Sequence, residues 1–143
     1  IMLAVLEKCS NVWCTKMNKL LFYIDFLSYR ECGSAMTGLT YRAIDYGPVP
    51  ERWDRIYSEF PEVTQEIRQC GDFEGSVLVA NGRVDTSVLS AQELEIIDKV
   101  CYALGNMSSR ELTQLSHQEQ GWIENKEKHD RIAFDYAFEL KAI

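Results

Sequence analysis

The hydrophobic pattern of the chain is strongest between residues 15 and 32. Apolar side chains recur there at the three- and four-residue spacing of an α-helix, and aromatic residues widen the apolar surface. Thr15 is a suitable N-cap for this helix, and Gly33 is a typical residue for ending one. Four polar residues share one narrow stripe, which we expect to face solvent: Lys16, Lys19, Tyr23 and Arg30. Most of the remaining surface is apolar, so the sequence predicts that this helix lies at the centre of the fold.

Weaker helical patterns cover four other segments, residues 1–8, 90–104, 109–117 and 131–141. At the second and third of them, a serine is followed three residues later by a glutamate, which is the capping-box pattern. The polar segment 118–129 contains one tryptophan and one isoleucine, so we expect it to contact the core once.

Strands are predicted in two places. Residues 39–44 alternate between apolar and polar side chains, and residues 73–79 are rich in strand-forming types. Asn81-Gly82 is typical of a two-residue hairpin turn, so Val84 is expected to begin a return strand. Residues 62–70 are ambiguous and suit a short helix. Together the strands predict a small antiparallel sheet on a helical body.

A rigid corner is predicted at Gly47, Pro48, Val49 and Pro50, because each proline fixes its own φ and keeps the preceding residue out of the helical region. Pro50 is also suited to the first position of a helix. An aromatic stripe with helical spacing follows, made of Trp53, Ile56, Tyr57 and Phe60. We therefore expect a helix that begins directly at the corner and ends before Pro61.

Length and composition fit one domain over residues 1–143, with 46% apolar and 26% charged residues. The predicted fold class is mainly α (α+β), a single compact helical domain with a small antiparallel β element. The chain opens at Ile1, inside an apolar run. We therefore expect it to be the C-terminal part of a longer protein.

The formal net charge of −7 argues against a nucleic-acid-binding face, which is normally basic, and is compatible with a basic protein partner. The densest apolar run, residues 20–27, is far shorter than the ~20 residues that a membrane span needs. The five cysteines show no CxxC spacing, so we expect buried free thiols in a reducing cytoplasm and no metal site.

Motifs of catalysis and of cofactor binding are missing from the sequence. Asp25 lies between apolar neighbours and must find a hydrogen-bond partner, so we interpret it as a structural carboxylate that holds a loop amide or a tyrosine. The alternative is an acid/base role, but nothing nearby completes a catalytic set. His117 has only Glu119 and His129 as companions in sequence, so we interpret it as structural or partner-contacting. No cofactor is predicted.

What remains is an argument about the surface of the corner. Tyrosine and tryptophan dominate interface hot spots, and a stiff loop loses little entropy on binding. The aromatic and rigid apolar groups of the corner are Tyr41, Tyr46, Pro48, Val49 and Pro50, and Trp53 lies close behind. The residues alone therefore favour a protein-interaction module.

Three runs of residues resemble a known family. They are Lys19-Leu20-Leu21-Phe22-Tyr23-Ile24-Asp25-Phe26-Leu27, then Thr37-Gly38-Leu39-Thr40-Tyr41, then Tyr46-Gly47-Pro48-Val49-Pro50. In this order they resemble the core of the SocA-like antitoxin domain, also called the Panacea domain. The later positions Ser116-His117 and Trp122 fit the same pattern, and the resemblance extends over roughly residues 1–140.

The resemblance implies a mainly helical bacterial or phage antitoxin that binds and neutralises a cognate toxin protein without catalysis. In one branch of the family it implies an adaptor that delivers the toxin to an ATP-dependent protease. It also implies that any contact with nucleic acid comes from residues outside this chain. We expect a cytoplasmic protein with no membrane contact, whose toxin-binding surface is the corner with His117 and Trp122 near it.

Two alternatives stay open at this stage. The first alternative to the antitoxin is the effector or dimerisation half of a DNA-binding transcriptional regulator. The second is an uncharacterised hydrolase built on Asp25 and His117. The hydrolase requires those two side chains to meet in one pocket.

Overall fold

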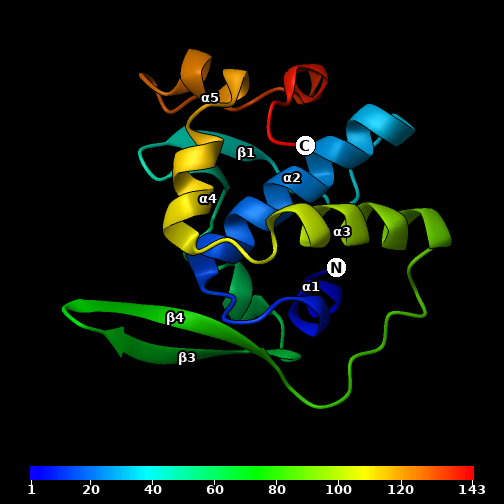
Figure 1. Cartoon of the computed structure of the whole chain (residues 1–143), viewed down its shortest axis with the longest axis vertical. Coiled ribbons are helices and arrows are strands. Elements are labelled where there is room, and N and C mark those ends of the chain that lie inside the picture. Colours follow the sequence, from blue (N-terminus) through cyan, green and yellow to red (C-terminus); the bar gives the residue numbers. More distant parts are fainter.

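Helix α2 (Cys14–Cys32) crosses the centre of the fold, as Figure 1 shows. The computed structural model describes the backbone of residues 1–143 and every side chain except that of Phe73. Every residue of α2 from Lys16 to Ser28 is buried, which confirms the predicted central helix. Its N-cap is Trp13 rather than Thr15, and Gly33 ends it in the left-handed conformation with φ of +81°.

The solvent-facing stripe predicted for α2 is wrong. Lys16, Lys19 and Tyr23 are all buried, and only Arg30 is partly exposed. The reason is that α3 (Ala91–Leu104), α4 (Ser109–Ser116) and other elements pack around the helix on several sides. The buried polar atoms find partners in those neighbours, as a low-polarity environment requires.

The two capped helices are confirmed. The Ser90 side chain accepts a hydrogen bond from the backbone N–H of Glu93 at the start of α3. At the start of α4, Ser108 and Glu111 form the full reciprocal capping box. Two shorter helices complete the helical body, α1 (Met2–Lys8), as predicted, and α5 (Gln120–Asn125).

The C-terminal helix predicted over residues 131–141 is wrong, because only the 3₁₀ helix η2 (Phe134–Glu139) forms there. The preceding segment is extended instead. The backbone N–H of Ile132 donates to the carbonyl of Tyr41 over 2.8 Å, and that of Ala43 donates to Asp130 over 3.0 Å. This pairing holds the chain along a strand edge until residue 133.

The corner forms a hairpin of β1 (Tyr41–Ile44) and β2 (Gly47–Pro50), joined by the two-residue turn Asp45-Tyr46. Pro50 pairs with Tyr41 at the open end of this hairpin and begins no helix. Arg52 has a φ of +62°, which interrupts a right-handed helix. The helix predicted over residues 50–60 is therefore wrong, and only the 3₁₀ helix η1 (Ile56–Glu59) forms.

A second hairpin joins β3 (Val63–Cys70) to β4 (Phe73–Ala80) through the turn Gly71-Asp72. The predicted strand over 73–79 is confirmed, but the helix over 62–70 and the turn at Asn81-Gly82 are wrong. Asn81 instead closes the open end of the hairpin, because its N–H donates to the Glu62 carbonyl over 2.8 Å. The two hairpins form separate two-stranded sheets, so the prediction that both strand regions join in one sheet is wrong. The predicted fold class, mainly α with a small antiparallel β element, is confirmed. The β3–β4 hairpin and α5 lie toward opposite ends of the long axis in Figure 1.

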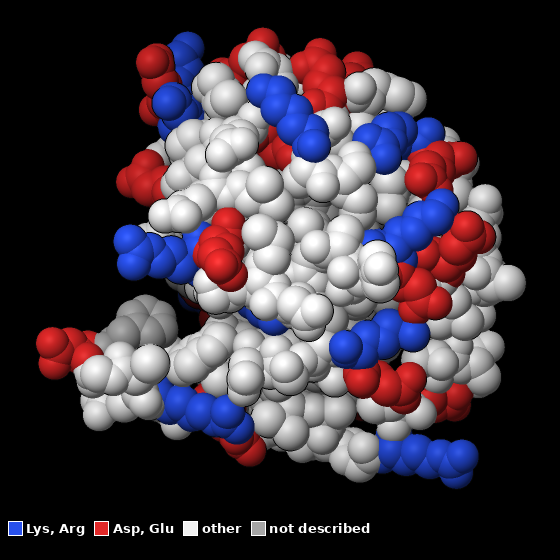
Figure 2. All heavy atoms as spheres, viewed as in Figure 1, with Lys and Arg blue, Asp and Glu red and all other residues white. Residues whose placement is uncertain are grey.

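Charged side chains of both signs are interspersed on the face shown in Figure 2. That face shows no continuous basic patch of the kind that binds a nucleic-acid backbone. Within the described part of the chain, no helix combines the length and the apolar character needed to cross a bilayer.

Candidate partner-binding surface

The turn Asp45-Tyr46 of the first hairpin is fixed from outside by three side chains. Trp122 on α5 donates its indole N–H to the carbonyl of Ile44 over 2.7 Å. The His117 imidazole forms a hydrogen bond with the backbone of Asp45, and Nε2 of His129 lies 3.1 Å from the Asp45 carboxylate. These contacts come from α5, from the segment that follows it and from the C-cap of α4, so the turn is held from three places.

The rings of His117 and Trp122 stack on each other, with centroids 4.0 Å apart and planes 14° apart. Lys126 places its amino group 5.1 Å from the centroid of the Trp122 ring, in a cation–π geometry. Among the described side chains, Nε2 of His117 is buried with no hydrogen-bond partner. Burial lowers the pKa of His117, although its hydrogen bond to Asp45 acts in the opposite direction. His117 is therefore a neutral stacking and orienting residue at neutral pH.

From inside, the hairpin rests on a buried lysine. Lys19 on α2 is 0% exposed and donates from Nζ to the carbonyl of Pro48 over 3.2 Å. Burial lowers the pKa of Lys19 to about 7, because the low-polarity surroundings disfavour the ammonium form. Gly47 has a φ of +99°, and a Cβ there would lie 2.7 Å from Oγ of Ser116 and 2.9 Å from Cε of Lys19. Only glycine fits between these two side chains in that conformation.

Replacing Gly47 by alanine is expected to lower the free energy of unfolding by about 2 kcal/mol or more, from backbone strain and overpacking. Gly38→Ala is the matched control, because no atom lies within 4 Å of a Cβ at Gly38 and no left-handed φ applies there. Urea unfolding of both variants tests this. If the two variants are equally stable, the hairpin accommodates a side chain at residue 47 without strain.

Two aromatic side chains remain on the outside of the turn. Tyr46 is 64% exposed and Trp53 is 40% exposed, and their rings meet edge to face with centroids 6.4 Å apart. We call this pair the Tyr46–Trp53 face. It is the part of the predicted interaction surface that lies open to a partner.

The other hairpin residues of the predicted surface are buried, which corrects the expectation of an exposed corner, whereas His117 and Trp122 are half-buried. Tyr41 and Val49 are 1% and 2% exposed, and Gly47, Pro48 and Pro50 are buried as well. The reason is that β2 packs between α2 and α4. These residues therefore shape and support the surface from below.

Asp25 is fully buried and accepts four hydrogen bonds. Its Oδ1 accepts from the backbone N–H groups of Met36 and Thr37, both over 2.8 Å. Its Oδ2 accepts from the hydroxyl of Thr37 over 2.5 Å and from that of Tyr41 over 2.6 Å. Asp25 and His117 thus form their hydrogen bonds with different residues. Among the described residues, no group of three or more His, Cys, Asp or Glu is placed to hold a metal ion.

Comparison with protein families decides the identity of the domain. The model of the family described as antitoxin SocA-like, Panacea domain, matches residues 17–123, which is well over half of the chain. The chain belongs to the SocA-like antitoxin family. No curated protein and no solved structure matches it. The matched segment runs from the first turn of α2 into α5, so it includes Lys19, Asp25, the hairpin, His117 and Trp122.

Membership of this family gives the chain an antitoxin-type role, in which the partner is in general a toxin. The residues of the three runs that resembled the family have distinct places in this antitoxin. Asp25 binds Thr37 and Tyr41 of the second run, and Lys19 binds Pro48 of the third. The family pattern therefore marks the polar contacts that fasten the hairpin to the central helix.

Sequence reasoning missed several polar residues of this SocA-like antitoxin. Glu119 is 2% exposed and accepts from the hydroxyl of Tyr23 and from the backbone N–H groups of Lys141 and Ala142. It thereby fastens the C-terminal segment to α2. Nothing in the spacing of Glu119 separated it from the surface glutamates around it. Lys19, by contrast, directly precedes the densest apolar run of the chain, residues 20–27, and that position was the available signal of burial.

Proposed function

We propose that this antitoxin neutralises its toxin by direct binding, with the Tyr46–Trp53 face as the centre of the interface. The observation that carries the proposal is an exposed aromatic pair, made of Tyr46 on a turn that is held in position and of Trp53, which follows β2 and meets the Tyr46 ring. Aromatic side chains contribute much of the binding energy in protein interfaces, because they bury a large area at a small entropy cost. A turn that is already ordered loses little further entropy when a partner docks.

The contacts behind the face support the same proposal. Trp122, His117 and His129 each form a hydrogen bond or an ion-pair contact with Ile44 or Asp45, next to Tyr46. They act as positioning residues, while Tyr46 and Trp53 touch the partner. The net charge of −7 favours a toxin whose docking surface is basic. Occlusion of the toxin by this face needs neither catalysis nor a protease.

The first experiment is co-expression of the full-length antitoxin gene with its immediate genomic neighbour, with growth rescue and co-purification as readouts. We expect the neighbour alone to arrest growth, and residues 1–143 to restore growth and to co-purify with it. Purified toxin and antitoxin, mixed without any protease, should reproduce the inhibition. If inhibition requires an ATP-dependent protease, the antitoxin acts as an adaptor and not by occlusion. If the neighbouring gene product is harmless, the proposed pairing is wrong, and promoter binding by the full-length chain is the next measurement.

Within that pair, Tyr46→Ala and Trp53→Ala are each expected to weaken toxin binding about 30-fold, corresponding to about 2 kcal/mol, the usual size of a hot spot. Tyr102→Ala is the matched control, because Tyr102 is a 92% exposed aromatic on α3. Calorimetric titration of the toxin into each variant measures the effect. Unchanged affinity in the folded Tyr46 and Trp53 variants would place the interface elsewhere.

A further inference from the structure

Two cysteine thiols meet where α1 ends against α3. Cys9 is the C-cap residue of α1 and leaves the helix in an extended conformation. Cys101 lies in the last turn of α3, on the helix face that it shares with Gly105 four residues later, and each of the two thiols shifts the pKa of the other. Sγ of Cys9 also rests on the end of α3, because it lies 2.8 Å from the position that a Cβ would take at Gly105. The two sulfurs are therefore neighbours across an interhelical contact.

Two lysines hold the Cys9 segment on α3. Nζ of Lys8 lies 2.6 Å from Oδ1 of Asp98, one turn before Cys101. Nζ of Lys16 donates to the carbonyl of Gly105 over 2.6 Å and to that of Ser10 over 3.3 Å. The chain is thus clamped to α3 at the residue before Cys9 and at the residue after it. Such clamping keeps Cys9 against the face of α3 that carries Cys101.

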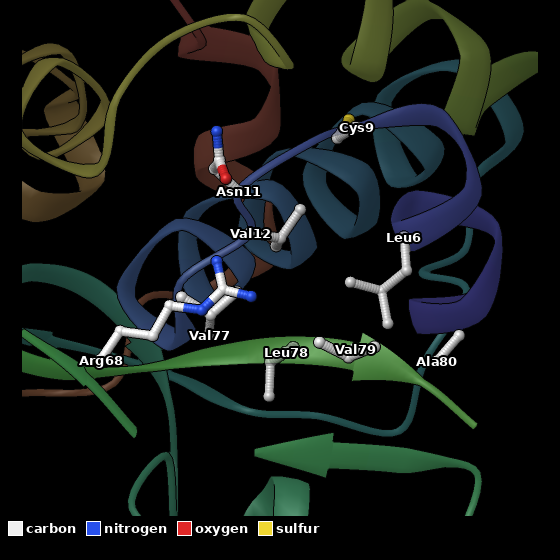
Figure 3. Close-up of a pocket in the computed structure, with 9 residues that line it drawn as sticks. All are labelled: Leu6, Cys9, Asn11, Val12, Arg68, Val77, Leu78, Val79 and Ala80. Carbon is white, nitrogen blue, oxygen red and sulfur yellow. The ribbon is translucent and has the colours of Figure 1, made fainter. Parts of the chain in front are cut away.

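A groove brings solvent to Cys9. It lies between α1, the segment that follows it and β4, and has a volume of about 320 Å³. Figure 3 shows Leu6 and Val12 on one side, Val77 to Ala80 of β4 opposite, and Cys9 at the edge of the groove with its sulfur directed away from β4. Cys9 is itself partly exposed. A small peroxide is not much larger than a water molecule, whose share of liquid volume is about 30 Å³, so it fits this groove easily. Cys101 is buried behind Cys9.

Cys9 is the more acidic of the two thiols, and the first step of thiol oxidation needs one deprotonated cysteine. The hydrogen bond from Cys101, with help from Lys16 and Lys8, lowers the pKa of Cys9 to about 7. The same hydrogen bond and burial raise the pKa of Cys101. Cys9 therefore carries more thiolate, which is the nucleophilic form, than an ordinary cysteine does at neutral pH, while Cys101 keeps its proton.

We propose that Cys9 and Cys101 form a modification site, a dithiol that a hydroperoxide closes reversibly into a disulfide. The Cys9 thiolate attacks one peroxide oxygen, the O–O bond breaks, and the leaving oxygen takes up a proton as water or an alcohol. Cys9 is then a sulfenic acid. The Cys101 thiol loses its proton, and its sulfur attacks Sγ of Cys9 and displaces the hydroxyl group as water. The two sulfurs give up two electrons, the peroxide takes them up, and α1 becomes covalently joined to α3.

The test treats residues 1–143 with an equivalent of hydrogen peroxide near pH 7, followed by alkylation of the remaining thiols and peptide mass spectrometry. We expect one intramolecular disulfide that links the Cys9 and Cys101 peptides and disappears with dithiothreitol. Cys9 should be consumed about tenfold faster than Cys70, an exposed cysteine outside the pair. Cys70→Ser is the matched control and should form the same disulfide.

Two variants separate the steps. Cys101→Ser should stop the reaction at a sulfenic acid on Cys9, detected as a dimedone adduct, and Cys9→Ser should give neither the adduct nor the disulfide. Peptide mapping of the unsubstituted protein keeps the test independent of whether the variants fold. Oxidation of Cys9 no faster than Cys70, or a disulfide through any other cysteine, would overturn the proposal. Toxin binding enters none of these readouts, so the proposed function stands or fails separately.

Discussion

Replacing Asp25 by alanine is expected to lower the free energy of unfolding by about 4 kcal/mol, an effect large enough to leave much of the protein unfolded at 37 °C. Asp25 is 0% exposed and accepts four hydrogen bonds from the segment between Met36 and Tyr41. Alanine leaves all four donors without their acceptor, and the buried Tyr41 hydroxyl loses a partner that water cannot easily replace. Thermal and urea unfolding of the purified variant measure the loss.

Asp25→Asn separates the contribution of the charge from that of the contacts. The amide oxygen still accepts from the Met36 and Thr37 backbone, but the amide nitrogen faces the two hydroxyl groups that donated to Oδ2. We expect an intermediate loss of about 2 kcal/mol. Asp54→Ala, at an aspartate with a 62% exposed side chain, should change stability by less than about 0.5 kcal/mol. An Asp25→Ala variant as stable as Asp54→Ala would show that the loop does not depend on this carboxylate.

The helices were predictable because their signals are local. Periodicity and a C-terminal glycine defined α2, and the serine-glutamate pattern located the starts of α3 and α4 within one residue. Such signals concern residues three or four apart, whose interactions the helix itself creates. These helix signals can therefore be recognised without knowing which distant residues the helix contacts.

The missed elements depend on partners that are distant in sequence. β3 has seven exposed residues out of eight, so burial imposes no alternation on it, and only its pairing with β4 makes it a strand. The 131–141 segment has helical spacing, but its first residues pair with β1 instead. Local propensity cannot report a competing backbone partner that is many residues away.

The candidate surface was predicted only in part, for a related reason. The sequence identified the hairpin residues and brought His117 and Trp122 to the same region, but it could not tell the supporting side of the hairpin from the exposed side. That distinction follows from the packing of β2 on α2 and α4, which buries Val49 and leaves Tyr46 in solvent. The role of the Tyr46–Trp53 face in toxin binding stays a prediction.

The second large effect expected is a rise in stability with pH that depends on Lys19. In the folded protein the pKa of Lys19 is lowered to about 7 by burial, whereas an unfolded lysine titrates near about 10.4. Between these values unfolding takes up a proton, so the free energy of unfolding rises with pH by up to about 1.4 kcal/mol per pH unit. From pH 7 to pH 9 the contribution of Lys19 is about 2 kcal/mol or more. Below pH 7 the folded protein carries the full cost of a buried ammonium.

Lys19→Met isolates this contribution, because methionine keeps an unbranched chain of similar volume and does not titrate. Urea unfolding at pH 6 to 9 should show that the variant equals or exceeds the wild type in stability at pH 6 and loses most of the rise above pH 7. Cys9 titrates in the same range in both proteins, so the difference between the two curves belongs to Lys19. Lys128→Met, at an exposed lysine, should follow the wild-type curve. If the free energy of unfolding of Lys19→Met and of the wild type changes in parallel with pH, Lys19 stays protonated in the folded protein. The hairpin then rests on a buried ammonium whose hydrogen bond to Pro48 is charge-assisted.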